Sequence, residues 1–156
     1  MALSVIIVLY VCVGVLAAAG SIFISQKLFS AKAEQIFFAL FLIAIAAFYL
    51  VFTAYFGQQR AWRMETGAVI VFAVFGVLGI RLPLVLIIGY SLHGIWDVIH
   101  EIHAHGGVSP FGGDEISQLP LAYGAFCAAY DWCMATYFCT RRHLWSAAWS
   151  GSPVNG

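Results

Sequence analysis

The sequence predicts an all-α protein, a polytopic bundle of transmembrane helices. Of its 156 residues, 63% are hydrophobic and only 9% are charged, and the mean hydropathy is +0.94. Soluble domains carry about 25% charged residues, so this chain has too few polar groups for a surface that faces water. Apolar stretches of about the 20 residues that a bilayer-crossing helix needs recur along its length. We therefore expect one membrane domain over residues 1–156, in contact with the lipid bilayer.

The first two expected spans cover residues 3–25 and 36–57. The first resembles a secretory signal peptide, but it lacks a basic N-terminal region and its apolar run is too long, so we interpret it as a retained helix. A polar connector, QKLFSAKAEQ, joins the two. The charged segment QQRAWRMET then leads to a short third span at residues 67–80. A re-entrant segment at this place would reduce the count from five spans to four.

The fourth expected span covers residues 83–102 and begins at Pro83, because proline is favoured in the first turn of a helix and disrupts its interior. A glycine-rich loop follows. The fifth span then runs over residues 120–142. The tail beyond it contains Trp145 and Trp149, which are typical of the membrane–water interface, so we expect it to lie on the membrane surface.

With five spans, the basic residues divide unequally between the two membrane faces. One face receives Lys27, Lys32, Arg81, Arg141 and Arg142, and the other receives Arg60 and Arg63. The positive-inside rule places the richer face in the cytoplasm. We therefore expect a multi-pass protein with its N-terminus outside and its C-terminus in the cytoplasm.

Several functional classes lack support in the sequence. The net charge is zero, so nothing indicates a nucleic-acid partner. No lysine lies near the middle of a span, which argues against a retinal Schiff base. The chain has no GxSxG, Walker or dinucleotide-binding motif. The four cysteines lie in apolar runs without a CxxC pair, so we expect packing residues and not a disulfide framework.

One stretch, SLHGIWDVIHEIHAHGG at residues 91–107, concentrates ionisable residues in an otherwise apolar chain. His93, Asp97 and His100 are spaced i, i+4 and i+7, so they share one face of the fourth span. Asp131 lies on the next, antiparallel span, and its depth differs from that of His93 by only about 5 Å. Ionisable groups at that depth are costly, need partners and are usually functional.

A divalent metal would satisfy this group of two imidazoles and two carboxylates. The combination is typical of a catalytic zinc site or of the facial triad of non-haem iron. We expect His93, Asp97, His100 and Asp131 to be metal ligands, with Asp97 and Asp131 catalytic and Asp131 as a ligand or general base. The metal, zinc or iron, would activate water, or dioxygen in the case of iron, for the hydrolysis or oxidation of a lipid-like substrate.

Other interpretations fit the same residues. The group could be a structural hydrogen-bond network that holds the helices together, in a homo-oligomer or an accessory subunit of a larger membrane complex. It could also relay charge through His93 and Asp97 in a proton or metal-ion carrier. The remaining polar residues nearby are expected to be solvated at the outer mouth of the bundle; they are Glu101, His103, His105, Asp114 and Glu115.

The segments LHGIWDVIHE and LAYGAFCAAYDW resemble a family of small bacterial integral membrane proteins of unknown function. Their pattern is a helix with LHGxWDxxH followed by a helix with CxxxD. The matching residues here are His93, Gly94, Trp96, Asp97, His100, Cys127 and Asp131. The resemblance implies a bundle of four or five helices in the bacterial inner membrane, without an established activity. A looser likeness to intramembrane hydrolases of the alkaline ceramidase and progestin-receptor type is an analogy of metal chemistry alone.

Overall fold

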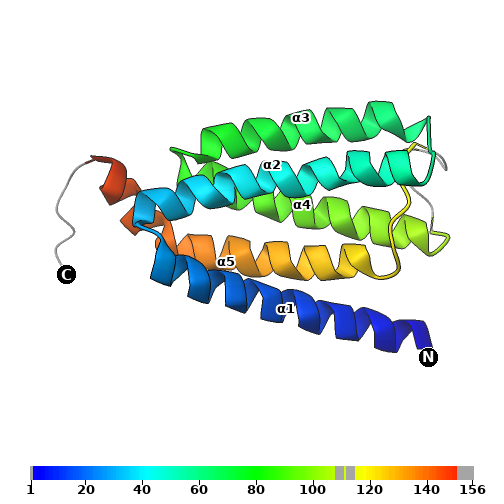
Figure 1. Ribbon diagram of the computed structural model, residues 1–156, viewed down its shortest axis with the longest axis horizontal. Coiled ribbons are helices and arrows are strands. Elements are labelled where there is room, and N and C mark those ends of the chain that lie inside the picture. Colours follow the sequence, from blue (N-terminus) through cyan, green and yellow to red (C-terminus); the bar gives the residue numbers. More distant parts are fainter. Residues whose placement is uncertain (1, 108–110, 112–114, 151–156) are drawn as a thin grey trace.

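Five helices that run alternately in opposite directions make up the computed structural model (Figure 1). The structure describes residues 2–107, 111 and 115–150, and no strand occurs among them. The helices are α1 (Ala2–Leu28), α2 (Ala31–Tyr55), α3 (Ala61–Gly79), α4 (Pro83–Ala104) and α5 (Tyr123–Ser150). The prediction of an all-α helical bundle is therefore confirmed.

Four of these helices, α1 to α4, are long and apolar enough to cross a membrane, which makes this a multi-pass membrane protein. The third helix has 19 residues and begins at Ala61, so it is not the short segment that the sequence suggested. Helix α5 is less apolar than the other four helices. It lies alongside α1 and α4 in the bundle (Figure 1), and one of its polar residues, Asp131, is fully buried.

Helix α2 begins earlier than expected, because part of the polar connector is its first turn. Ser30 caps this turn: its Oγ accepts a hydrogen bond from the Ala33 N–H at 3.4 Å, and its carbonyl accepts one from the Glu34 N–H at 2.8 Å. A serine side chain at this position satisfies a backbone donor that the helix leaves unpaired. As a result, Glu34 and Gln35 are fully buried within the bundle.

The apolar core lies between α2, α4 and α5. Its fully buried members include Phe38, Leu42, Leu86, Met134 and Phe138. Because lipid is as apolar as these side chains, close packing and hydrogen bonds between helices hold such a bundle together.

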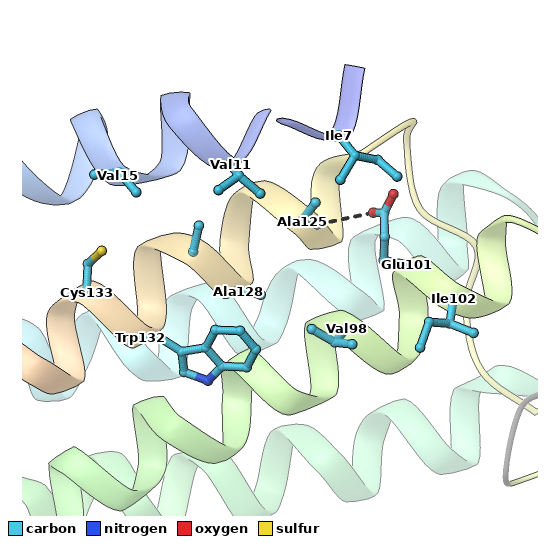
Figure 2. Close-up of a pocket in the computed structure, with 11 residues that line it drawn as sticks. Ile7, Val11, Val15, Val98, Glu101, Ile102, Ala125, Ala128, Trp132 and Cys133 are labelled. Carbon is cyan, nitrogen blue, oxygen red and sulfur yellow. Dashed lines mark hydrogen bonds between the residues drawn. The ribbon is translucent and has the colours of Figure 1, made fainter. Parts of the chain in front are cut away.

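Helix α1 packs mainly against α5, and it faces lipid along much of its length. The two backbones meet at Gly14, where an added Cβ would lie 2.4 Å from the Phe126 carbonyl oxygen. Towards the N-terminus of α1, a groove of about 460 Å³ opens between α1, α4 and α5 (Figure 2). Its lining is apolar except near Glu101, whose carboxylate accepts a hydrogen bond from the Ala125 N–H.

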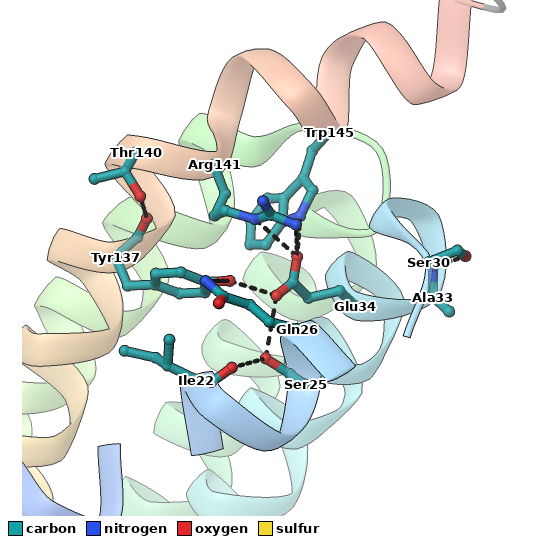
Figure 3. Close-up of polar contacts among 10 residues, drawn as sticks. All are labelled: Ile22, Ser25, Gln26, Ser30, Ala33, Glu34, Tyr137, Thr140, Arg141 and Trp145. Atoms are coloured by element: carbon teal, nitrogen blue, oxygen red, sulfur yellow. Dashed lines mark hydrogen bonds and ion pairs between the residues drawn. The ribbon is translucent and has the colours of Figure 1, made fainter. Parts of the chain in front are cut away.

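A carboxylate network joins α1, α2 and α5 at the other end of the bundle (Figure 3). Glu34 Oε1 accepts hydrogen bonds from the Tyr137 hydroxyl at 2.5 Å and from the Ser25 hydroxyl at 3.1 Å. Glu34 Oε2 accepts them from Arg141 Nη2 at 2.9 Å and from Trp145 Nε1 at 2.8 Å. Both oxygens of the buried carboxylate are therefore satisfied by protein donors.

The expected surface location of the tail is wrong for Trp145. Helix α5 continues to Ser150, and Trp145 is fully buried because its indole N–H reaches Glu34. Trp149 is half-buried and donates a hydrogen bond to Gln35 Oε1 at 2.9 Å. These donors fix the end of α5 to the start of α2, an attachment that hydropathy alone does not indicate.

We predict that Glu34→Gln destabilises the protein, because an amide replaces one acceptor oxygen with a donor and removes the charge opposite Arg141. A buried donor without its partner costs about 1–3 kcal/mol. The measurement is thermal unfolding in detergent. The matched control is Glu115→Gln, which makes the same chemical change at an exposed residue and should shift stability by no more than about 0.5 kcal/mol. Equal unfolding temperatures for the two variants would contradict the prediction.

Candidate metal centre

Close contact between α4 and α5 positions the candidate site. A Cβ added at Gly124 would lie 2.5 Å from the Asp97 carbonyl oxygen, and one added at Gly94 would lie 2.7 Å from Trp132 Nε1. Neither glycine can be replaced without movement of the neighbouring helix or side chain. The LHGxWD segment therefore lies directly against α5, at the level of Asp131.

His93, Asp97 and Asp131 come together inside the bundle. His93 Nδ1 lies 2.7 Å from Asp131 Oδ2 and 3.3 Å from Asp97 Oδ2. One potential ligand atom from each of the three residues lies within 4.8 Å of the other two. No more than 1% of any of the three is exposed. The expected meeting of the fourth and fifth helices around these three residues is what the structure shows.

Three buried polar atoms in this group have no hydrogen-bond partner in the described part of the protein. They are His93 Nε2, Asp97 Oδ2 and Asp131 Oδ1. A buried polar atom without a partner costs free energy in an apolar interior. The group also carries two carboxylates for one imidazole, so a negative charge would remain beside a protonated His93 when both carboxylates are ionised. A bound cation would remove both penalties.

Tyr49 of α2 extends the site and was not predicted from the sequence. Its fully buried hydroxyl donates a short hydrogen bond to Asp97 Oδ1. Its ring lies beside the rings of His93 and His100, with centroid separations of 5.9 and 4.3 Å. Tyr49 thus fixes the orientation of the Asp97 carboxylate. The only signal in the sequence is a hydroxyl-bearing residue inside an apolar run, and a tyrosine there more often serves for packing.

His100 does not join the group and instead pairs with Glu65 of α3. His100 Nε2 lies 2.8 Å from Glu65 Oε1, and His100 Nδ1 donates to the Trp96 carbonyl at 2.9 Å. The Ser117 N–H also donates to Glu65 Oε1 at 2.7 Å. Because the expected third span began at residue 67, Glu65 was assigned to a loop, and this partner for His100 was missed. In the structure, Glu65 is fully buried.

The residues predicted to be solvated at the outer mouth of the bundle differ in their exposure. Glu101 is only 8% exposed, so its expected solvation is wrong: it pairs with His105 Nε2 at 2.7 Å and accepts a hydrogen bond from the Ala125 N–H. Glu115 is exposed, as expected, and Asp114 lies outside the described residues.

The donor set of the group fits a divalent cation. Imidazole nitrogen and carboxylate oxygen are ligands for zinc and for iron. Two carboxylates balance a charge of +2, and three protein ligands leave a position for water or substrate, as in catalytic zinc sites. His93, Asp97 and Asp131 are therefore the residues that could hold the metal, and His100 lies outside this set.

The structure defines an all-helical, multi-pass membrane protein with a buried imidazole–carboxylate group between two adjacent helices. The chain belongs to a family of unknown function, DUF6010, whose family model matches residues 7–143. This confirms the expectation of an uncharacterised family, and the match includes α2, α3 and α4 and most of α1 and α5. No functionally curated protein and no solved structure matches the chain.

We predict that Gly124→Ala disturbs the site, because the new methyl group would collide with the backbone of Asp97 and push α4 away from α5. Overpacking of this kind typically costs about 1–3 kcal/mol. The control is Gly20→Ala in α1, where nothing lies within 4 Å of the added Cβ and alanine should stabilise the helix by up to about 1 kcal/mol. The unfolding temperature should fall in Gly124→Ala and rise in Gly20→Ala. A shift of both unfolding temperatures in the same direction would contradict this prediction.

Proposed function

We propose that this protein is an intramembrane metal-dependent enzyme that acts on a lipid-like substrate. The observation that carries the proposal is the buried group of His93, Asp97 and Asp131, in which one polar atom of each residue forms no hydrogen bond with the described part of the chain. Zinc or iron is the metal class that such ligands favour. The substrate class is inferred from the location of His93 and Asp97 on α4, which has the composition of a membrane span.

The residues around the group have distinct roles in this proposal. A divalent metal held here would supply an activated water, or activated dioxygen in the case of iron. Asp97 is oriented by the Tyr49 hydroxyl and acts as a ligand. Asp131 Oδ1 has no hydrogen-bond partner and can accept a proton from the attacking nucleophile, while Oδ2 faces His93. Burial of all three side chains excludes bulk water from the centre.

Metal analysis tests the proposal. The protein purified in mild detergent should contain zinc or iron in stoichiometric amounts by mass spectrometry of the elements. His93→Ala and Asp131→Asn should abolish binding, because each removes a ligand. Tyr49→Phe should weaken binding about 10- to 100-fold, the usual effect of losing a group that orients a ligand. His100→Gln is the matched control on α4 and should keep its metal.

Far-ultraviolet circular dichroism and monodisperse elution should confirm that each variant is folded. Metal that is substoichiometric and unaffected by His93→Ala or Asp131→Asn would refute the metal centre.

Enzymatic activity requires a second measurement. Incubation with membrane lipid extract should yield products with the unsubstituted protein and not with Asp131→Asn.

A structural hydrogen-bond network and an ion carrier are the rival functions. A network of structural bonds alone would leave the folded protein without metal and, in an accessory subunit, associated with a larger complex after mild extraction. A carrier would transport protons or metal ions into proteoliposomes, and Asp97→Asn should stop that transport. The unpartnered atoms favour the metal enzyme, because a structural network is expected to satisfy its own polar groups.

A further inference from the structure

We propose that an anionic phospholipid binds in the cavity between α3 and α4, with its phosphate at Arg63 and an acyl chain against Phe72 and Trp96. Its identity as substrate rests on the proposed function, whereas its binding does not require the metal. The cavity has a volume of about 330 Å³ and is lined mainly by apolar side chains of α3. Gly67 is part of this lining, and a Cβ added there would meet nothing within 4 Å.

This cavity lies next to the candidate metal centre. Phe72 lines it, and its ring centroid is 4.7 Å from that of His93 in an edge-to-face arrangement. Trp96 also lines it, and its ring centroid is 5.0 Å from that of His100. These two aromatic side chains therefore separate the cavity from the buried histidines. A rotation of Phe72 would bring a bound chain into contact with His93.

Two polar groups of the cavity lack partners among the described residues. Arg63 is exposed and forms no ion pair there, and the buried Trp96 Nε1–H has no acceptor. Arg63 lies in the first turn of α3, where the helix dipole also favours an anion. Because α3 has the composition of a membrane span, its first turn is at the level of lipid headgroups. A headgroup phosphate there would give Arg63 a charge-assisted partner.

The larger groove between α1, α4 and α5 is a poorer match for this ligand (Figure 2). Its ionisable side chain, Glu101, is negatively charged and already paired with His105. The α4 and α5 backbones also meet at Gly124 and separate this groove from the face that carries His93. Charge and location both favour the cavity at Arg63.

Trp96 allows binding to be measured without any assay of activity. The protein is reconstituted in bilayers that contain phosphatidylglycerol or phosphatidylcholine with brominated acyl chains, which quench tryptophan fluorescence on contact. We expect stronger quenching by phosphatidylglycerol, and Trp96→Phe should remove this difference. Arg63→Gln should lower the apparent affinity for phosphatidylglycerol about fivefold, the effect of one basic residue near an anionic lipid.

Two further variants control the experiment. Arg142→Gln removes an exposed cation elsewhere on the protein and should leave the phosphatidylglycerol preference unchanged. Gly67→Leu should fill the cavity and reduce Trp96 quenching by both lipids. Equal quenching by the two lipids, or an unchanged preference in Arg63→Gln, would overturn the proposal.

Metal content separates this inference from the proposed function. Arg63→Gln and Gly67→Leu should retain their metal, because neither residue belongs to the His93, Asp97 and Asp131 group. Lipid preference at Trp96 in a protein that binds no metal would support the lipid site and refute the metal enzyme. Metal binding without a preference for phosphatidylglycerol would support the metal centre and refute the lipid site.

Discussion

In the hydrocarbon core of a bilayer, every ionisable side chain must find its partner within the protein, because acyl chains offer neither charge nor hydrogen bonds. This constraint explains why the polar residues of the chain are gathered into networks and not scattered. The hydrogen bonds of Glu34 are complete, because both of its carboxylate oxygens accept hydrogen bonds from protein donors, Arg141 among them. The hydrogen bonds of Glu65 are incomplete. Its Oε1 pairs with His100 and accepts a hydrogen bond from the Ser117 N–H, whereas its Oε2 has no hydrogen-bond partner among the described residues.

The group of His93, Asp97 and Asp131 differs from both networks. It is as deeply buried as Glu34, yet one polar atom of each member forms no hydrogen bond within the described part of the protein, and two carboxylates face a single imidazole. Proteins rarely maintain such a group without a ligand or a chemical role, because its cost recurs in every folded molecule. The Glu65 carboxylate also has one oxygen without a hydrogen bond to the described residues, so the group of His93, Asp97 and Asp131 is distinguished by having three such atoms on neighbouring residues.

Much of this arrangement could be predicted from the sequence. Helical spacing placed His93 and Asp97 on one face, and counting inward along two antiparallel helices brought Asp131 to the same depth. The errors arose where polar residues lie inside helix ends. Glu34 and Glu65 were assigned to connectors because hydropathy marks the apolar part of a span and not the first turn of its helix. His100 shares the periodicity of the group, but the position of α3 determines its partner, and no periodic pattern specifies which helix lies opposite.

The Glu34 network and the group of His93, Asp97 and Asp131 both depend on α5, which the ribosome makes after the other four helices. It supplies Asp131 to His93, and it supplies Tyr137, Arg141 and Trp145 to Glu34. Until α5 arrives, the carboxylate of Glu34 on α2 lacks most of its partners. These contacts can therefore form only after α5 has been made, and docking of α5 completes the packing of the bundle.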